Sequence, residues 1–274
     1  MFEGARVVVT GGSSGIGLAT AELFARRGAH VGLVARDPGR LEAAREAVAA
    51  AAAEGARIEA VSADLSQTEQ ARHAIDELAR RGLEPDVLVN SAGVILPGRF
   101  EEMPLDFFTR NMDCGYYSVV YPTRAAVPYM IARGAGHVVN VSSVAGFIGV
   151  YGYTGYSAAK YAVMGFSEAL RCEMKPRGVR VSVVCPPDTD TPGLAYEKTL
   201  RPPETDVIAG NVKAIPPAAV AKAVVRAVER GTYLVIPGLE SRAYHKLKGL
   251  WPGLFFAVFD SQVAKARRAE ERGG

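Results

Sequence analysis

The sequence predicts an α/β fold: a doubly wound parallel sheet of about seven strands with helices on both faces. Short runs of consecutive apolar residues, such as Val7-Val8-Val9, alternate along the chain with longer segments whose apolar residues recur at helical spacing. Strands that are apolar throughout are typical of parallel sheets, because helices cover both of their faces. Right-handed crossovers between such strands produce the doubly wound arrangement. A chain of 274 residues, 49% of them hydrophobic, fits one such domain.

The expected elements alternate through most of the chain, each helix separating two strands. Strands are predicted at residues 6–10, 30–35, 57–62, 86–90, 137–143, 179–185 and 233–236. Helices are predicted at residues 14–28, from after 35 to about 54, and at 67–81, 157–175 and 218–230. Residues 186–217 are rich in proline and are expected to form a long irregular loop, which is usually functional. Residues 1–239 are therefore predicted to form one domain, with residues 240–274 as an appended segment.

The composition excludes several classes of protein. The chain has 32 Lys and Arg against 29 Asp and Glu, and a net charge of +3 is too small by itself to indicate nucleic-acid binding. Three scattered cysteines predict neither a disulfide framework nor a metal site. The sequence shows no secretory-signal pattern and no run of about 18 apolar residues that would span a bilayer. We therefore expect a cytoplasmic protein that binds no metal and no nucleic acid.

A glycine-rich segment, Thr10-Gly-Gly-Ser-Ser-Gly-Ile-Gly17, follows the first expected strand and opens directly into a helix. Glycines allow a tight turn and a close approach of the backbone to a pyrophosphate, and the helix N-terminus offers free N–H groups to phosphates. A plain turn is the alternative, but the strand before the segment and the helix after it favour dinucleotide binding. The predicted cofactor contacts here are Gly11, Ser13, Ser14, Gly15, Ile16 and Gly17.

The end of the second expected strand indicates which dinucleotide binds. A site for NAD usually has Asp or Glu at this position, whereas this chain has Ala35, followed by Arg36 and, one helical turn later, Arg40. Two guanidinium groups suit a 2′-phosphate, so NADPH is the predicted cofactor. The alternative is that both arginines form a solvated face beside neighbouring acidic residues. Asp64 and Leu65, after the third expected strand, are placed to meet the adenine.

Tyr156 and Lys160 are four residues apart, a spacing that places both side chains on one face of a helix. A tyrosine with a pKa near about 10 is a poor acid–base group at neutral pH until something stabilises its phenolate. The charge of Lys160 does so. Ser143, at the end of the fifth expected strand, is placed to hydrogen-bond a substrate oxygen. The spacing alone is weak evidence, since such Tyr–Lys pairs occur on many surface helices.

Together these motifs resemble the short-chain dehydrogenase/reductase superfamily over roughly residues 5–238. The motifs are the glycine-rich segment, Asn90-Ser-Ala-Gly93, Ser143, and the YxxxK of Tyr156 and Lys160. The resemblance implies a Rossmann-like fold and hydride transfer between nicotinamide C4 and a carbonyl carbon. It implies that Tyr156 is the general acid in reduction, that Lys160 lowers its pKa and binds the nicotinamide ribose, and that Ser143 orients the carbonyl. It also implies cofactor contacts at Asn90, Ala92 and Gly93.

The chain departs from the superfamily at one position. An asparagine ordinarily lies in the helix before the fifth strand and holds a water that links the catalytic lysine to solvent. The segment Met112-Asp-Cys-Gly115 places Gly115 there, which puts the proton relay in question but not hydride transfer. Asn111, about one helical turn earlier, is a candidate substitute. The alternative is that Asn111 is a surface or capping residue.

Several segments resemble the 3-ketodihydrosphingosine reductases (3-dehydrosphinganine reductases) within the superfamily. They are Leu33–Arg36, Val120–Arg124, Tyr151–Thr154, Cys185–Gly193, Arg201–Thr205 and Phe259–Ser261. This resemblance implies reduction of the 3-keto group of a long-chain sphingoid base by NADPH in sphingolipid biosynthesis, and cofactor contacts at Pro186, Thr189 and Thr191. A reductase of steroid, retinoid or 3-ketoacyl substrates and a cofactor-binding sensor without turnover stay open as alternatives. Membrane-bound relatives have an N-terminal hydrophobic anchor that this sequence lacks, so a bacterial-type protein is expected.

The C-terminal segment combines an apolar run with basic flanks. Residues 249–259 read GLWPGLFFAVF, too short to span a bilayer but long enough to lie in its interface. Residues 240–274 hold 7 Lys and Arg against 4 Asp and Glu, whereas residues 1–239 hold 25 of each, so the whole excess charge lies here.

Peripheral contact of this segment with an anionic membrane is expected. The alternative is that the segment packs on the sheet or across a dimer, and both hold if it forms the lip of an apolar cleft. The expected partners are a long-chain keto-amine lipid, a membrane surface and further copies of the chain, as a dimer or tetramer.

Overall fold

The computed structural model describes residues 2–209 and 213–273 and contains one sheet of seven parallel strands, in the order β3-β2-β1-β4-β5-β6-β7. The strands are β1 (Arg6–Thr10), β2 (His30–Ala35), β3 (Ile58–Ser62), β4 (Val87–Asn90), β5 (Gly136–Val141), β6 (Val179–Val184) and β7 (Leu234–Val235). The strand order reverses between β1 and β4, and the crevice above such a reversal is where doubly wound sheets bind ligands. The predicted fold class is confirmed.

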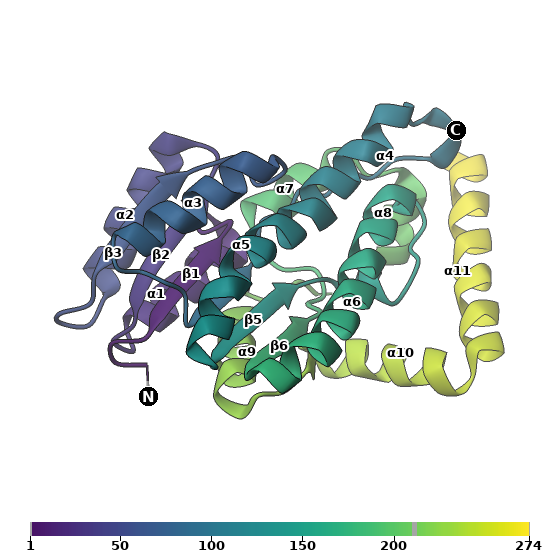
Figure 1. Cartoon of the computed structure of the whole chain (residues 1–274). Coiled ribbons are helices and arrows are strands. Elements are labelled where there is room, and N and C mark those ends of the chain that lie inside the picture. Colours follow the sequence, from purple (N-terminus) through teal and green to yellow (C-terminus); the bar gives the residue numbers. More distant parts are fainter. Residues whose placement is uncertain (1, 210–212, 274) are drawn as a thin grey trace.

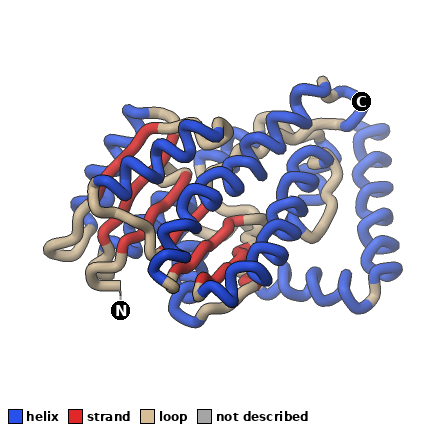
Figure 2. Tube along the Cα trace, in the orientation of Figure 1, coloured by secondary structure: helices blue, strands red, loops and turns tan. Residues whose placement is uncertain are grey.

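Helices cover both faces of the sheet (Figures 1 and 2). The helices of the N-terminal half of the sheet are α1 (Gly15–Ala25), α2 (Pro38–Ala51) and α3 (Thr68–Arg80). The central helices are α4 (Leu105–Met112), α5 (Ser118–Arg133) and α6 (Thr154–Met174), and a π-helical turn (Asp113–Tyr117) joins α4 to α5. The remaining helices are α7 (Pro192–Lys198), α8 (Pro203–Ala209), α9 (Pro217–Arg230), α10 (Leu239–Leu250) and α11 (Pro252–Gly273).

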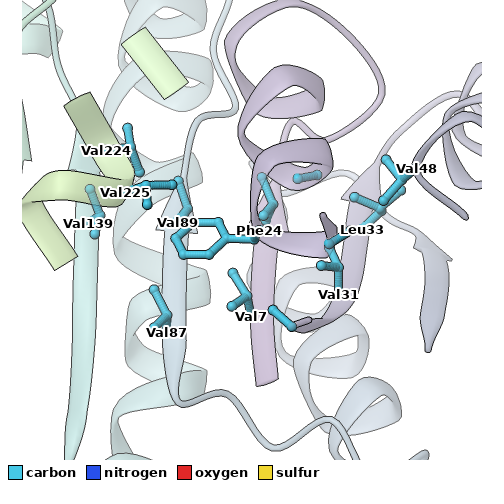
Figure 3. Close-up of a cluster of buried hydrophobic side chains, with 14 of the residues drawn as sticks. Val7, Phe24, Val31, Leu33, Val48, Val87, Val89, Val139, Val224 and Val225 are labelled. Carbon is cyan, nitrogen blue, oxygen red and sulfur yellow. The ribbon is translucent and has the colours of Figure 1, made fainter. Parts of the chain in front are cut away.

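The alternation of side chains along each strand divides the core into two layers. Val7 and Val9 point to the face covered by α1, α2 and α9, whereas Val8 points to the face covered by α3 and α5. In the first layer Phe24 of α1 lies against the sheet between β1 and β4, in the same cluster as Val224 and Val225 of α9 (Figure 3). All of these side chains are fully buried, and each stabilises the fold by about 1.5–3 kcal/mol. This packing fixes the strand ends that carry the site.

The structure differs from the prediction in the segment expected to be an irregular loop. This segment contains the short helices α7 and α8, and residues 210–212 lie outside the described residues. Helix α7 begins because the Thr191 side chain accepts a hydrogen bond from the backbone N–H of Leu194 and Pro192 occupies the first turn. Proline therefore starts helices here rather than preventing them.

The C-terminal segment folds into α10 and α11, which extend beyond the end of the sheet and turn a corner at Trp251 (Figure 1). Helix α11 packs against α8 and α10. Across residues 2–209 and 213–273, no helix combines the length and the apolar character needed to cross a membrane.

Candidate active site

A cavity of about 840 Å³ lies at the carboxyl ends of the strands and extends from the glycine-rich loop to the C-terminal helices. It brings together most of the residues predicted to form the site. Those lining it are Gly11, Ser13, Ser14, Gly15, Ile16, Gly17, Arg36, Arg40, Asp64, Leu65, Ala92, Gly93, Ser143, Tyr156, Lys160, Pro186, Thr189 and Thr191. Asn90 is placed differently, because it is buried in the sheet and donates to Thr123 and Asn140.

The glycine-rich loop has the shape of a cradle that side chains would fill. A Cβ atom at Gly17 would lie 2.2 Å from the carbonyl oxygen of Gly11, and a Cβ at Gly11 would lie 2.7 Å from the backbone nitrogen of Ala92. Gly11 and Gly15 also have positive φ angles, 65° and 54°, that favour glycine. Helix α1 begins at Gly15, so its free N–H groups face the loop. The residues present therefore fit the pyrophosphate of a dinucleotide.

Arg36 and Arg40 lie on the rim of the cavity, where both side chains are exposed. Arg40 also lies 3.9 Å from the carboxylate of Asp37, which caps α2 by accepting a hydrogen bond from the Arg40 backbone. An exposed pair at this distance contributes little stability, so both guanidinium groups remain able to turn toward a phosphate.

Tyr156 and Lys160 lie one helical turn apart near the start of α6, and both side chains are buried. The Lys160 ammonium lies 5.7 Å from the centre of the Tyr156 ring and donates to the carbonyl oxygen of Val141, at 3.2 Å. That is its one hydrogen bond within the described part of the chain, which leaves two donors for a ligand. Ser143 follows β5 and accepts a hydrogen bond from the backbone of Ala145.

The electrostatics of the pocket keep the tyrosine protonated. Burial raises the pKa of Tyr156 well above its ordinary value; a hydrogen bond with Ser143 acts against burial, and the negative charges of Glu197 and Asp188 add to it. Burial also lowers the pKa of Lys160 to about 8. At neutral pH the pocket therefore holds a neutral phenol, able to donate a proton, beside a largely charged ammonium.

The position that carries asparagine in relatives is tightly packed in this chain. Gly115 lies in the π-helical turn, and a Cβ there would approach the Cβ of Ala159 to 2.9 Å. Asn111 is buried, so the alternative that it lies at the surface is wrong: its amide donates to the Phe107 carbonyl at 3.0 Å and to the Leu96 carbonyl at 3.5 Å. The amide thus ties α4 to the loop after β4. Whether Asn111 serves the proton relay stays a prediction.

A group of charged residues on the substrate side of the cavity was not anticipated from the sequence. Asp188 and Glu197 line the cavity, and both bind the buried side chain of Arg201. The only signal in the sequence is the spacing of Glu197 and Arg201, four residues apart, which is ordinary for a helical ion pair.

The C-terminal helices supply the far end of the cavity. Ser241 and Tyr244 of α10 and Phe259 of α11 line it, so this segment contributes to the cavity wall. Phe255 is buried and stacks on Phe259, with ring centres 5.0 Å apart. Lys248 fastens α10 to the domain by donating to the Phe147 carbonyl at 2.6 Å and to the Tyr161 hydroxyl at 2.5 Å.

Known proteins of similar sequence include two reductases that are named for the same substrate. The chain is 43% identical to a 3-dehydrosphinganine reductase from Danio rerio and 41% identical to a 3-ketodihydrosphingosine reductase from Bos taurus. Each match covers 234 residues, which are 85% of this chain and 70% of the relative.

Solved structures and a family model identify the family of the chain. Levodione reductase is 27% identical with a TM-score of 0.82, over 89% of this chain and 100% of that one. A Sphingobium yanoikuyae short-chain dehydrogenase in complex with NADPH is 28% identical with a TM-score of 0.76, over 91% and 94%. The fold of these proteins binds NAD or NADP. The family model of the short chain dehydrogenases matches residues 5–200. The chain belongs to the short-chain dehydrogenase/reductase family of oxidoreductases.

Proposed function

We propose that this protein uses NADPH to reduce the 3-keto group of 3-ketodihydrosphingosine, giving dihydrosphingosine. The observation that carries the proposal is one cavity that joins the glycine-rich loop, the Tyr156–Lys160 pair and an apolar wall. The apolar wall consists of Ile95, Leu96, Ile148, Val150, Leu194 and Phe259. A wall of this kind suits an alkyl chain, since apolar surface gains about 25 cal/mol for each Å² that leaves water. The identity to 3-ketodihydrosphingosine reductases supports the same substrate.

The residues of the pocket divide the chemistry among them. Bound nicotinamide supplies the hydride that reaches the carbonyl carbon. Ser143 orients the carbonyl by hydrogen-bonding its oxygen, and Tyr156 donates its proton to that oxygen as negative charge develops there. The resulting phenolate is stabilised by the Lys160 ammonium, whose remaining donors hold the ribose hydroxyls. Arg36 and Arg40 hold the 2′-phosphate that distinguishes NADPH from NADH.

A substrate panel assayed with NADPH and with NADH tests the proposal. We expect 3-ketodihydrosphingosine to be reduced with a higher kcat/KM than a steroid, a retinal or a short 3-ketoacyl compound, and NADPH to be preferred. Tyr156→Phe should lower kcat by at least about 100-fold, because it removes the general acid, while NADPH still binds. Preference for another substrate class would overturn the assignment, and a wild-type protein that binds NADPH but reduces nothing would be a cofactor-binding sensor.

We also propose that the corner between α10 and α11 contacts an anionic membrane surface. Its apolar side chains are exposed: Leu250, Trp251, Leu254, Phe256 and Val258. Exposed cations flank them on the same two helices: Arg242, Lys246, Lys265, Arg267 and Arg268. Apolar side chains enter the interface while cations attract the lipid headgroups, by about 1 kcal/mol each near the surface. Residues of these two helices also line the cavity. The proposal therefore has a lipid enter the site from the membrane side.

A further inference from the structure

Four polar residues, all with buried side chains except the partly exposed Asp188, form a cluster beside the catalytic tyrosine. They are Tyr153 before α6, Asp188 after β6, Glu197 in α7 and Arg201 after α7. The rings of Tyr153 and Tyr156 lie 5.9 Å apart, centre to centre, which places the cluster next to the proton donor. Three of the four, all except Arg201, line the cavity.

Within the cluster, only one of the two oxygens of each carboxylate accepts hydrogen bonds. Arg201 donates to Oε1 of Glu197 at 2.5 and 2.7 Å and to Oδ2 of Asp188 at 3.0 Å. The Tyr153 hydroxyl also donates to Oε1 of Glu197. Within residues 2–209 and 213–273, Oε2 of Glu197 and Oδ1 of Asp188 accept no hydrogen bond. The side chain of Glu197 is only 2% exposed, and both Glu197 and Asp188 line the cavity. Two acceptor oxygens on the cavity wall are therefore available to a ligand.

The charges of the cluster do not balance. One guanidinium faces two carboxylates on the cavity wall, and a third carboxylate, Asp206, lies 3.9 Å from Arg201 on the exposed side. The negative excess acts on the catalytic centre, because Glu197 and Asp188 oppose formation of the Tyr156 phenolate. When a neutral ketone is bound, the two carboxylates still oppose formation of the phenolate. A cation bound between the cluster and Tyr156 offsets their negative charge.

We propose that Asp188 and Glu197 bind the protonated amino group of the substrate, on the carbon next to the reacting carbonyl. The inference rests on the proposed function, whose substrate carries an ammonium at that carbon. A charge-assisted hydrogen bond from the ammonium to each free oxygen fixes the orientation of the carbonyl toward Tyr156. The same cation offsets the negative excess when the phenolate forms. The ligand class is therefore an α-amino ketone, and neutral ketones of equal chain length bind and react less well.

Asp188→Asn tests the inference because it removes one charge and keeps an oxygen for Arg201. Asp190→Asn is the matched control, since Asp190 is exposed, two residues away, and does not line the cavity. The substrates are 3-ketodihydrosphingosine and the same ketone without its amino group, each assayed with NADPH. Asp188→Asn should lower kcat/KM for the amino ketone by at least about tenfold and should not lower it for the neutral ketone, because the removed charge opposes the Tyr156 phenolate. Asp190→Asn should change neither by more than about twofold.

A binding measurement separates this inference from the proposed function. We expect wild-type protein with NADP to bind dihydrosphingosine at least about tenfold more tightly than the matched 1,3-diol without the amino group, and Asp188→Asn to remove most of that preference. Equal affinities, or equal losses for both substrates, would overturn the inference while reduction of the amino ketone still supports the function. Selective binding without turnover would support the ammonium site and overturn the reductase.

Discussion

Lys160 is a residue at which catalysis and stability oppose each other. Burial lowers the pKa of its ammonium to about 8, so the charged form costs the folded state about 3 kcal/mol at pH 7. We expect Lys160→Met to abolish reduction and to raise the free energy of unfolding at pH 7 by about 1–3 kcal/mol. Denaturant unfolding measures this difference, with Lys222→Met at an exposed site of α9 as the control.

The effect of Lys160 on stability has a definite pH dependence. Below the folded-state pKa both states carry the charge, and the cost is complete. From about pH 8 to about 10.5 the folded state loses its proton while the unfolded state keeps it, so the wild-type protein gains stability as the pH rises. The difference between wild type and Lys160→Met should therefore shrink between pH 7 and pH 10. A constant difference would contradict a buried charge at this position.

Gly115 shows that the family's usual residue does not fit every member. A Cβ at Gly115 would approach the Cβ of Ala159 to 2.9 Å, and both residues lie in packed helical segments. Gly115→Asn should therefore lower the free energy of unfolding by about 1–3 kcal/mol. Adding Ala159→Gly should recover part of that loss, a coupling that thermal unfolding of the two single variants and the double variant measures. Independent effects of the two substitutions would rule out the contact as the cause.

At the scale of the elements, local pattern predicted the parallel strands and most of the helices that flank them. Apolar runs such as β1 and β4 fit only as strands buried between two layers of helices. The order of the elements and the position of the glycine-rich loop could therefore be predicted from the sequence. The helices α7 and α8 did not, because proline at a first helical turn cannot be distinguished locally from proline in a loop. The π-helical turn was not predicted either, and Gly115 within it lies close to Ala159 of α6.

The same reasoning accounts for the site residues. Tyr156, Lys160 and Ser143 were found because their spacing forms a motif, whereas the cluster of Asp188, Glu197 and Arg201 depends on how the segment after β6 folds back. Asn90 was predicted to contact the cofactor from its motif alone. Its side chain instead bonds Asn140 of the neighbouring strand, a partner that only the register of the sheet reveals.

Helix α11 offers a matched pair of adjacent residues with opposite roles. Phe255 is buried against Phe259, whereas Phe256 is 51% exposed at the corner proposed to contact membrane. Phe256→Ser should weaken binding to vesicles of phosphatidylcholine and phosphatidylserine about fivefold, the effect of about 1 kcal/mol of lost burial, with unchanged thermal unfolding. Phe255→Ser should instead loosen α11, as faster hydrogen exchange in that helix would show. Vesicle binding that Phe256→Ser leaves unchanged would argue against this corner as the membrane contact.

At the scale of the whole molecule, the charge and the apolar surface are unevenly distributed. Residues 1–239 have no net charge, while residues 240–274 hold the entire excess of +3. The same segment carries the exposed apolar side chains of Leu250, Trp251, Leu254, Phe256 and Val258. The molecule therefore has a neutral body and a cationic, apolar end, which is the arrangement that the proposed contact with an anionic surface requires. The dimer or tetramer expected from the family stays a prediction.

The two ends of the cavity come from separate parts of the chain. Loops at the strand ends form the end at the glycine-rich loop, and α10 and α11 form much of the other. Substitutions in α10 and α11 can therefore alter the far wall of the cavity without altering the residues proposed to move hydride and proton. Residues 239–273 are thus the segment to exchange with a relative when the proposed substrate specificity is to be changed and the reaction kept.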